Sequence, residues 1–158
     1  MKDRNLAFVH IDDTDEGPRA ALSVEGMLLL SRDPETTLRE AAAVYARHLA
    51  DMRRVLSQIE CLRASRRPIP ARKIWQLGNL VFRLRDALAR HSLQLDDLYA
   101  HLTRDLGVKR KWLEKAIILR RYIPSSTMIP KGLTWGRCEK GTRRVAQDLA
   151  VRYRRSAQ

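Results

Sequence analysis

The chain has 158 residues, of which 44% are hydrophobic and 31% are charged. This length and composition suit one folded domain, or one domain with a small appendage, and exclude a disordered or membrane-embedded class of protein. The excess of Lys and Arg gives a net charge of +13 at pH 7, which favours a polyanionic partner. The alternative is a basic protein that stays soluble by self-repulsion.

The positive charge is concentrated in the second half of the sequence. Residues 1–69 carry 11 Lys or Arg and 11 Asp or Glu, whereas residues 70–158 carry 20 against 7. The second half therefore supplies the whole net charge, and we expect it to contact nucleic acid.

The N-terminus resembles neither a secretory signal nor an Arg-rich transit peptide, so we expect a cytoplasmic protein. The longest apolar run, Gly26–Leu30, is too short to cross a bilayer, and no membrane partner is expected. The two cysteines, Cys61 and Cys138, form no CxxC pair. We expect both to be small, partly buried apolar residues without a disulfide.

The first expected elements are two strands. Leu6–Ile11 is a β-prone run that ends in the polar stretch Asp12–Pro18, and Ala20–Leu30 offers a second run. A lone two-stranded ribbon is only marginally stable in water. It should therefore pack on the helices or pair its free edge with another chain.

A long helix is expected next. Asp33 and Pro34 are typical of an N-cap and a first helical position, and the apolar stripe that starts at Leu38 extends to about Ala64. Two prolines in the segment Ser65–Pro70 then end the helix. This break is the predicted boundary between a neutral protein-contact or dimerisation region, residues 1–67, and a basic nucleic-acid-binding domain, residues 68–158.

The basic half is expected to be helical, so the predicted fold class is mainly α, with a short N-terminal β-ribbon. The expected elements are a helix from Ile74 to Leu88 that ends near His91–Ser92, a helix over Leu95–Leu106 capped by Ser92, a helix through Trp112–Leu119, an extended segment over Ile123–Trp135 and a last basic helix over Glu139–Tyr153.

The sequence Leu106-Gly107-Val108 between two of these helices has the order of a helix-turn-helix. Leu106 and Val108 would fill the core between crossing helices, and Gly107 would permit the positive φ of the turn. Trp112, Leu113 and Ile117 would hold the second helix to that core. An ordinary αα-hairpin with a solvated basic face is the alternative.

The candidate DNA-binding residues are exposed cations in this region. Lys109, Arg110 and Lys111 start the second helix, where a helix-turn-helix presents side chains to the major groove. Lys115, Arg120 and Arg121 follow on the same helix, and Lys131, Arg137, Lys140, Arg143 and Arg144 are expected to contact phosphates, together with Arg152, Arg154 and Arg155. Lys140, Arg143, Arg144 and Arg152 are expected to share one helix face.

Three aromatic residues are interleaved with the C-terminal charge. Tyr122, Trp135 and Tyr153 could stack on unpaired bases of RNA or single-stranded DNA. Such aromatics more often belong to the core, and we favour that for Trp135.

Segments within Ile74–Arg144 carry a family resemblance. Ile74-Trp75-Gln76-Leu77-Gly78, Leu102-Thr103-Arg104-Asp105-Leu106, Leu113, Arg121-Tyr122-Ile123-Pro124 and Leu133-Thr134-Trp135 resemble the N-terminal helical DNA-binding domain of YhcG-type bacterial proteins. The resemblance covers less than half of the chain and implies DNA binding in a mobile-element or defence context. Too few residues follow Trp135 for the nuclease domain of that family, so nuclease activity is not implied.

No catalytic, metal or cofactor site is expected. The acidic run from Asp12 to Glu16 could in principle hold Mg²⁺, but no lysine with nuclease-like spacing follows it. The four histidines are dispersed without metal-ligand spacing, and His101 is expected on a helix surface. No Walker loop, nucleophile elbow or GxGxxG is present.

The sequence thus predicts a non-enzymatic DNA-binding protein, either a regulator or an architectural subunit, with double-stranded DNA favoured as its ligand. Residues 1–67 would form a homodimer or join a larger complex. The alternative is a small subunit of a nucleoprotein defence complex that contacts RNA or single strands.

Overall fold

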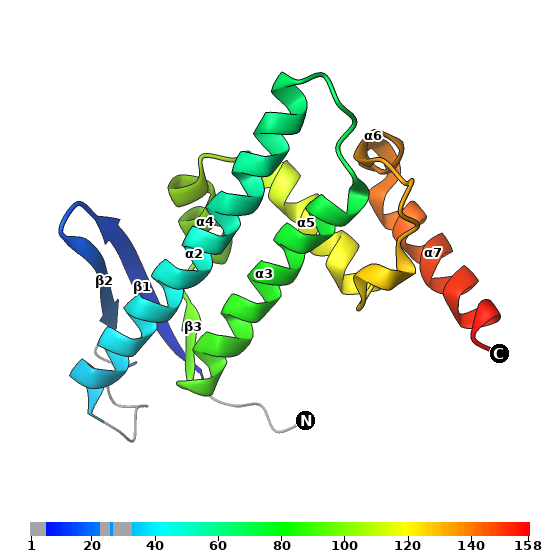
Figure 1. Cartoon of the computed structure of the whole chain (residues 1–158). Coiled ribbons are helices and arrows are strands. Elements are labelled where there is room, and N and C mark those ends of the chain that lie inside the picture. Colours follow the sequence, from blue (N-terminus) through cyan, green and yellow to red (C-terminus); the bar gives the residue numbers. More distant parts are fainter. Residues whose placement is uncertain (1–5, 23–25, 27–32) are drawn as a thin grey trace. The chain divides into compact units, whose positions relative to one another are not determined.

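The computed structural model describes residues 6–22, 26 and 33–158, which form a mainly helical protein with one small sheet (Figure 1). This confirms the predicted fold class. Most of the second predicted strand beyond Leu22 lies outside the described residues. None of the described helices is long and apolar enough to span a lipid bilayer.

The chain divides into two compact units. Unit 1 comprises residues 1–51 and 82–108, and unit 2 comprises residues 52–81 and 109–158. The division differs from the boundary after residue 67 that charge and prolines predicted. The reason is that two long helices, α2 (Pro34–Ala64) and α3 (Ala71–Arg90), each give one half to each unit, so no single cut in the sequence separates them.

Unit 1 contains a three-stranded sheet in the order β2-β1-β3. The predicted ribbon is present as β1 (Ala7–Thr14) and β2 (Gly17–Leu22), which pair antiparallel. β1 is longer than expected because Asp12–Thr14 continue the ladder opposite residues 17–19. Alternate residues of β1 are buried, as the period of two in a strand requires.

The third strand, β3 (Leu93–Leu95), pairs parallel to β1 and was not predicted. Sequence periodicity placed Leu95 in a helix with Ser92 as its cap, and both interpretations are wrong. Ser92 has a φ of +59°, and the following helix, α4 (Leu98–Leu106), is instead capped by Asp97, whose side chain accepts a hydrogen bond from the amide of Ala100 at 2.9 Å.

Helix α2 has the predicted bounds. The Asp33 side chain accepts hydrogen bonds from the amide of Glu35 at 3.2 Å and the hydroxyl of Thr36 at 2.8 Å. These bonds hold the pKa of the Asp33 carboxyl below its ordinary value. The helix therefore starts with the side-chain cap that its sequence indicates.

In unit 2, the helix α5 (Arg110–Tyr122) packs against α7 (Thr142–Ser156). The unit also contains the second half of α2, the first half of α3 and the short elements η1 (Ser126–Met128), α6 (Trp135–Cys138) and η2 (Glu139–Gly141). The last helix thus starts later and ends later than predicted. Trp135 is 4% exposed, which confirms it as a core residue.

Helices α3 and α5 approach each other closely in unit 2. A Cβ added to Gly78 would lie 2.2 Å from the carbonyl oxygen of Ala116, so only glycine fits there. Beside this contact, the indole N–H of Trp75 donates to the carbonyl of Ile123 at 2.6 Å. Both contacts fix α5 on α3.

The two cysteines differ in burial. Both are free; Cys138 is buried, whereas Cys61 is exposed on α2, contrary to the expectation that both are partly buried. Burial raises the pKa of the Cys138 thiol.

Candidate nucleic-acid interface

The charge of the protein is divided between the two compact units more sharply than between the two halves of the sequence. Unit 2 contains 21 Lys or Arg and 4 Asp or Glu, a net charge of +17, whereas unit 1 contains 10 and 14, a net charge of −4. Sequence reasoning placed the cations of residues 52–67 in a neutral region, yet they belong to the basic unit. Their Arg-Arg pairs at 53–54 and 66–67 were the available signal.

The predicted contacts at the start of α5 are on the surface. Lys109, Arg110 and Lys111 are exposed, and Arg110 donates from Nε to Glu114 at 2.9 Å. Lys115, one turn further, is half-buried. The first turn of α5 contains no acidic residue, and its N-cap, Lys109, makes no side-chain cap bond. The positive end of the helix dipole thus adds to the charge of these lysines.

The two arginines at the end of α5 differ in exposure. Arg121 is exposed, whereas Arg120 is half-buried. The guanidinium of Arg120 donates from Nε to Asn79 at 2.8 Å and lies 5.7 Å from the ring centroid of Trp75. Arg120 therefore joins α5 to α3, and we leave it out of the proposed contact surface.

The C-terminal candidates are all exposed: Lys131, Arg137, Lys140, Arg143 and Arg144. The expectation that four cations share one helix face is wrong. Lys140 precedes α7, and Arg143 and Arg152 are nine residues apart, which is half a turn out of phase on an α-helix. Arg144 instead lies opposite the buried residues Ala146 and Ala150 and faces solvent.

The elements of the predicted helix-turn-helix are formed. Gly107 has a φ of +67°, as expected, and its N–H donates to Thr103 at 3.0 Å. Leu106 and Val108, expected to be core residues, are only half-buried. Helix α4 belongs to unit 1 and α5 to unit 2, and the helix-turn-helix stays a prediction.

The anchoring residues of α5 differ in burial. Leu113 and Ile117 are buried in unit 2, as expected, whereas Trp112 is half-buried. The apolar side of α5 thus packs within unit 2, and most of the cations of this helix are exposed.

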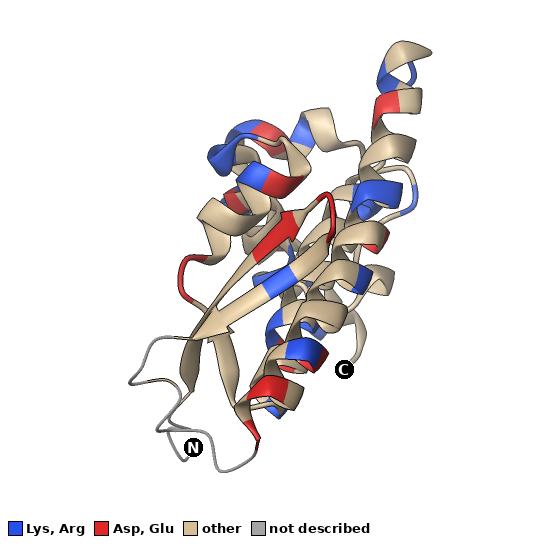
Figure 2. Ribbon diagram, turned by 90° about the vertical axis from the view of Figure 1, so that its left-hand side faces the viewer, with Lys and Arg blue, Asp and Glu red and all other residues tan. Residues whose placement is uncertain are grey.

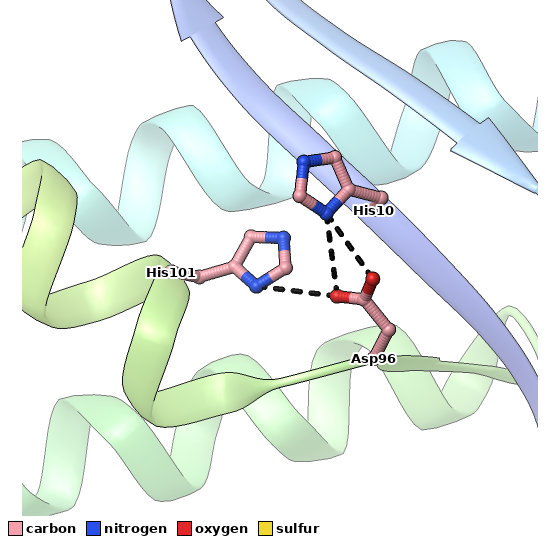
Figure 3. A group of neighbouring side chains, drawn as sticks. All are labelled: His10, Asp96 and His101. Carbon is pink, nitrogen blue, oxygen red and sulfur yellow. Dashed lines mark hydrogen bonds and ion pairs between the residues drawn. The ribbon is translucent and has the colours of Figure 1, made fainter.

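Unit 1 contains a polar cluster that the sequence did not reveal. His10 on β1, Asp96 after β3 and His101 on α4 lie together (Figure 3). Nδ1 of His10 is 3.2 Å from Asp96, and Nε2 of His10 is 3.1 Å from Asp12. Two of the four histidines, His10 and His101, thus lie together in space, and His101, at 1% exposure, is buried and not on the helix surface as predicted.

His101 acts as a hydrogen-bond partner of the sheet. Its Nε2 accepts from the amide of Ile11 at 3.0 Å, and its Nδ1 is 2.6 Å from the carbonyl of Asp97. Nδ1 must therefore carry the proton. A metal ion on Nδ1 would force the proton onto Nε2, against the amide of Ile11. The donor set of this cluster does not fit a metal ion.

Arg104, one turn beyond His101, completes this connection. It donates to the carbonyl of Ile11 at 2.8 Å, to Asp12 at 3.0 Å and to Asp105 at 2.7 Å. β3 ends opposite Val9 and does not reach Ile11. Helix α4 takes its place: His101 accepts from the amide of Ile11, and Arg104 donates to its carbonyl. The cluster stabilises the sheet.

Asp105 is the buried acid of this network. Burial alone would raise the pKa of its carboxyl, but hydrogen bonds from Arg104 and Tyr45 and the charge of Arg104 hold that pKa below its ordinary value. Burial and the neighbouring Asp105 in turn raise the pKa of Tyr45, whose hydroxyl donates to Asp105 at 2.5 Å.

The acidic run at the end of β1 and in the turn to β2 is the other acidic feature of unit 1 (red in Figure 2). Asp12 is already engaged by Arg104 and His10, and Glu16 forms an ion pair with Arg19. These contacts pair Asp12 and Glu16 with cations of unit 1.

Comparison of the chain with known protein families, with curated proteins and with solved structures finds no match. The resemblance to YhcG-type DNA-binding domains stays an expectation from the sequence.

Proposed function

We propose that the protein is a non-enzymatic DNA-binding protein whose basic unit 2 contacts double-stranded DNA. The observation that carries the proposal is the confinement of a net charge of +17 to one compact unit, with most of its cations exposed. Such charge opposes folding by self-repulsion and is compensated by a polyanion.

The first turn of α5 is the proposed reading element. Lys109, Arg110 and Lys111 would approach base edges in the major groove, as in a helix-turn-helix. Arg121 and the exposed cations after α5 would contact phosphates, which position a protein on DNA without reading its sequence.

The proposed biological role is that of a regulator or an architectural subunit in the cytoplasm. A bacterial mobile-element or defence context is part of the proposal and depends on the sequence resemblance alone.

Of the predicted contact region 1–67, the part that belongs to unit 1, residues 1–51, is the proposed protein-contact or dimerisation segment. Its described part carries one supporting feature, Phe8, which is 54% exposed on the outer face of β1. Aromatic side chains are enriched in the cores of protein–protein interfaces, so contact with another protein surface would bury Phe8. Size-exclusion chromatography with light scattering tests this, since a Phe8→Ser variant of a dimer is expected to elute as a monomer.

A mobility-shift titration at two salt concentrations tests DNA binding. The wild-type chain is expected to bind duplex DNA more tightly than single-stranded DNA or RNA of equal length. In Lys111→Glu/Arg144→Glu we expect affinity to fall at least about tenfold and the log–log salt slope to fall by about 0.9, because Arg144 is the phosphate contact of the pair.

A matched control uses Arg47→Glu/Arg83→Glu, which removes the same charge from exposed residues of unit 1. This variant is expected to bind as wild type does. Equal losses in both double variants would show that net charge alone determines binding and would contradict a site in unit 2.

A groove in unit 2 supports a second candidate, binding of RNA or single strands. Its volume is about 380 Å³, and its lining includes Leu133, Val145 and Leu149 together with two arginines and one acid, Arg137, Arg152 and Asp148. An apolar groove beside arginines suits an unpaired base and its phosphate. Tighter binding of single-stranded DNA or RNA than of duplex in the same titration favours this candidate.

A further inference from the structure

The end of helix α2 has an unusual residue at its capping position. The amide of Arg67 donates to the carbonyl of Leu62 at 2.9 Å, and the amide of Arg66 donates to that of Arg63 at 3.0 Å. This pair of bonds is the Schellman motif, whose C′ residue is left-handed. Here that residue is Arg66, with a φ of +54°.

Glycine is the residue that this backbone conformation favours. An arginine at positive φ carries strain from its Cβ that glycine avoids. Arg66 therefore contributes nothing to the cap that glycine would not provide, and the reason for an arginine lies in its side chain. That side chain and that of Arg67 are exposed, and among the described residues neither has a hydrogen bond or ion pair.

A β-bridge sets the position of this loop within unit 2. Pro70 pairs antiparallel with Thr134, and the amide of Trp135 donates to the carbonyl of Ile69 at 2.7 Å. In an antiparallel pair, residues that precede one partner lie beside residues that follow the other. The segment before Pro70, which contains Arg67, therefore leaves the bridge on the side where α6 begins after Thr134.

We propose that Arg66 and Arg67 form a phosphate contact that continues the cationic surface of Arg137 and Lys140 on unit 2. The inference rests on the proposed function and extends it to a loop that sequence analysis assigned to the protein-contact region. Four exposed cations from two segments of one unit then act on one polyanion backbone.

Glycine substitution separates the two roles of Arg66. Arg66→Gly removes the charge and suits the backbone, so the midpoint of thermal unfolding is expected to stay within about 2 °C of wild type or to rise. Its affinity for duplex DNA is expected to fall about three- to tenfold, with a salt slope smaller by about 0.9. Arg67→Gln is expected to change binding to the same extent.

Two controls match these variants. Ser92→Gly makes the same backbone change at the other non-glycine residue of positive φ in the described chain, without a change of charge. Arg83→Gln removes one exposed charge from unit 1. Both are expected to bind duplex DNA as wild type does.

The outcomes separate this inference from the proposed function. If the wild-type chain does not bind duplex DNA, the proposed function fails, and the inference fails with it. If wild type binds and Arg66→Gly binds equally well, only the inference fails. A loss in Arg83→Gln as large as that in Arg66→Gly also overturns it, because net charge would then explain both.

Discussion

The two units use their charged side chains in opposite ways. In unit 1, Arg104 donates to Asp105 at 2.7 Å and the Tyr45 hydroxyl donates to the same carboxylate, so opposite charges satisfy one another inside the fold. In unit 2, 21 cations meet 4 acids, and most cations cannot have a carboxylate of their own. Opposite charges thus stabilise unit 1, whereas unit 2 has a large excess of cations and depends on apolar packing for its stability.

The largest expected effect tests packing in unit 2. Gly78→Ala places a Cβ against the backbone of Ala116 and is expected to lower the free energy of unfolding by about 3 kcal/mol. Thermal denaturation measures this. The control Gly136→Ala, in α6, meets no atom within 4 Å and is expected to change stability by less than about 1 kcal/mol. Equal effects would contradict the close approach of α3 and α5.

His101 tests the polar network of unit 1. His101→Leu leaves the buried amide of Ile11 without its acceptor, and the expected loss is about 2–3 kcal/mol by chemical denaturation. His10→Gln changes an exposed member of the same cluster, 45% exposed at its side chain, and is expected to lose less than about 1 kcal/mol. A larger loss in His10→Gln would show that the cluster depends on its exposed ion pairs.

The contribution of Asp105 to the stability of unit 1 is expected to depend on pH. Its folded-state pKa is lowered, so its stabilisation is present above the ordinary value near 3.8 and is lost as pH falls through the folded pKa. Asp105→Asn is expected to be about 2 kcal/mol less stable than wild type at pH 7. The two stabilities should converge as pH falls below the ordinary value near 3.8 and through the lowered folded pKa. A difference that is constant with pH would mean that the ionised form is not what stabilises the fold.

The smallest expected effect compares one arginine of each unit. Arg104→Gln should lower stability by about 1 kcal/mol, a value reduced by its 43% exposure, and leave DNA affinity unchanged. Arg144→Gln should weaken DNA binding and change stability by less than about 0.5 kcal/mol. Both variants are measured by denaturation and by mobility shift. A loss of stability in Arg144→Gln would show that charge also stabilises unit 2 and would contradict the difference between the units.

Local signals in the sequence predicted the helices well. Asp33 and Pro34 set the start of α2, the prolines at 68 and 70 separated α2 from α3, and Gly107 ended α4. Each signal acts through hydrogen bonds or φ angles of residues within one or two turns, so neighbouring residues are sufficient to encode it.

The missed features share a different origin. β3 has three residues and no strand pattern of its own, and it exists because β1 offers a free edge 86 residues away. His101 was predicted on a helix surface, yet it is buried, because its ring nitrogen accepts the hydrogen bond of the Ile11 amide in β1. Neither partner is visible in the local sequence.

The sequence by itself determined the net charge, the helical class and the bounds of α2, because composition and local backbone preference are properties of single residues and their neighbours. Only the tertiary structure decided which residues share a compact unit. It moved the cations of residues 52–67 from a neutral half into a unit of net charge +17, since long helices carry their two ends into different cores.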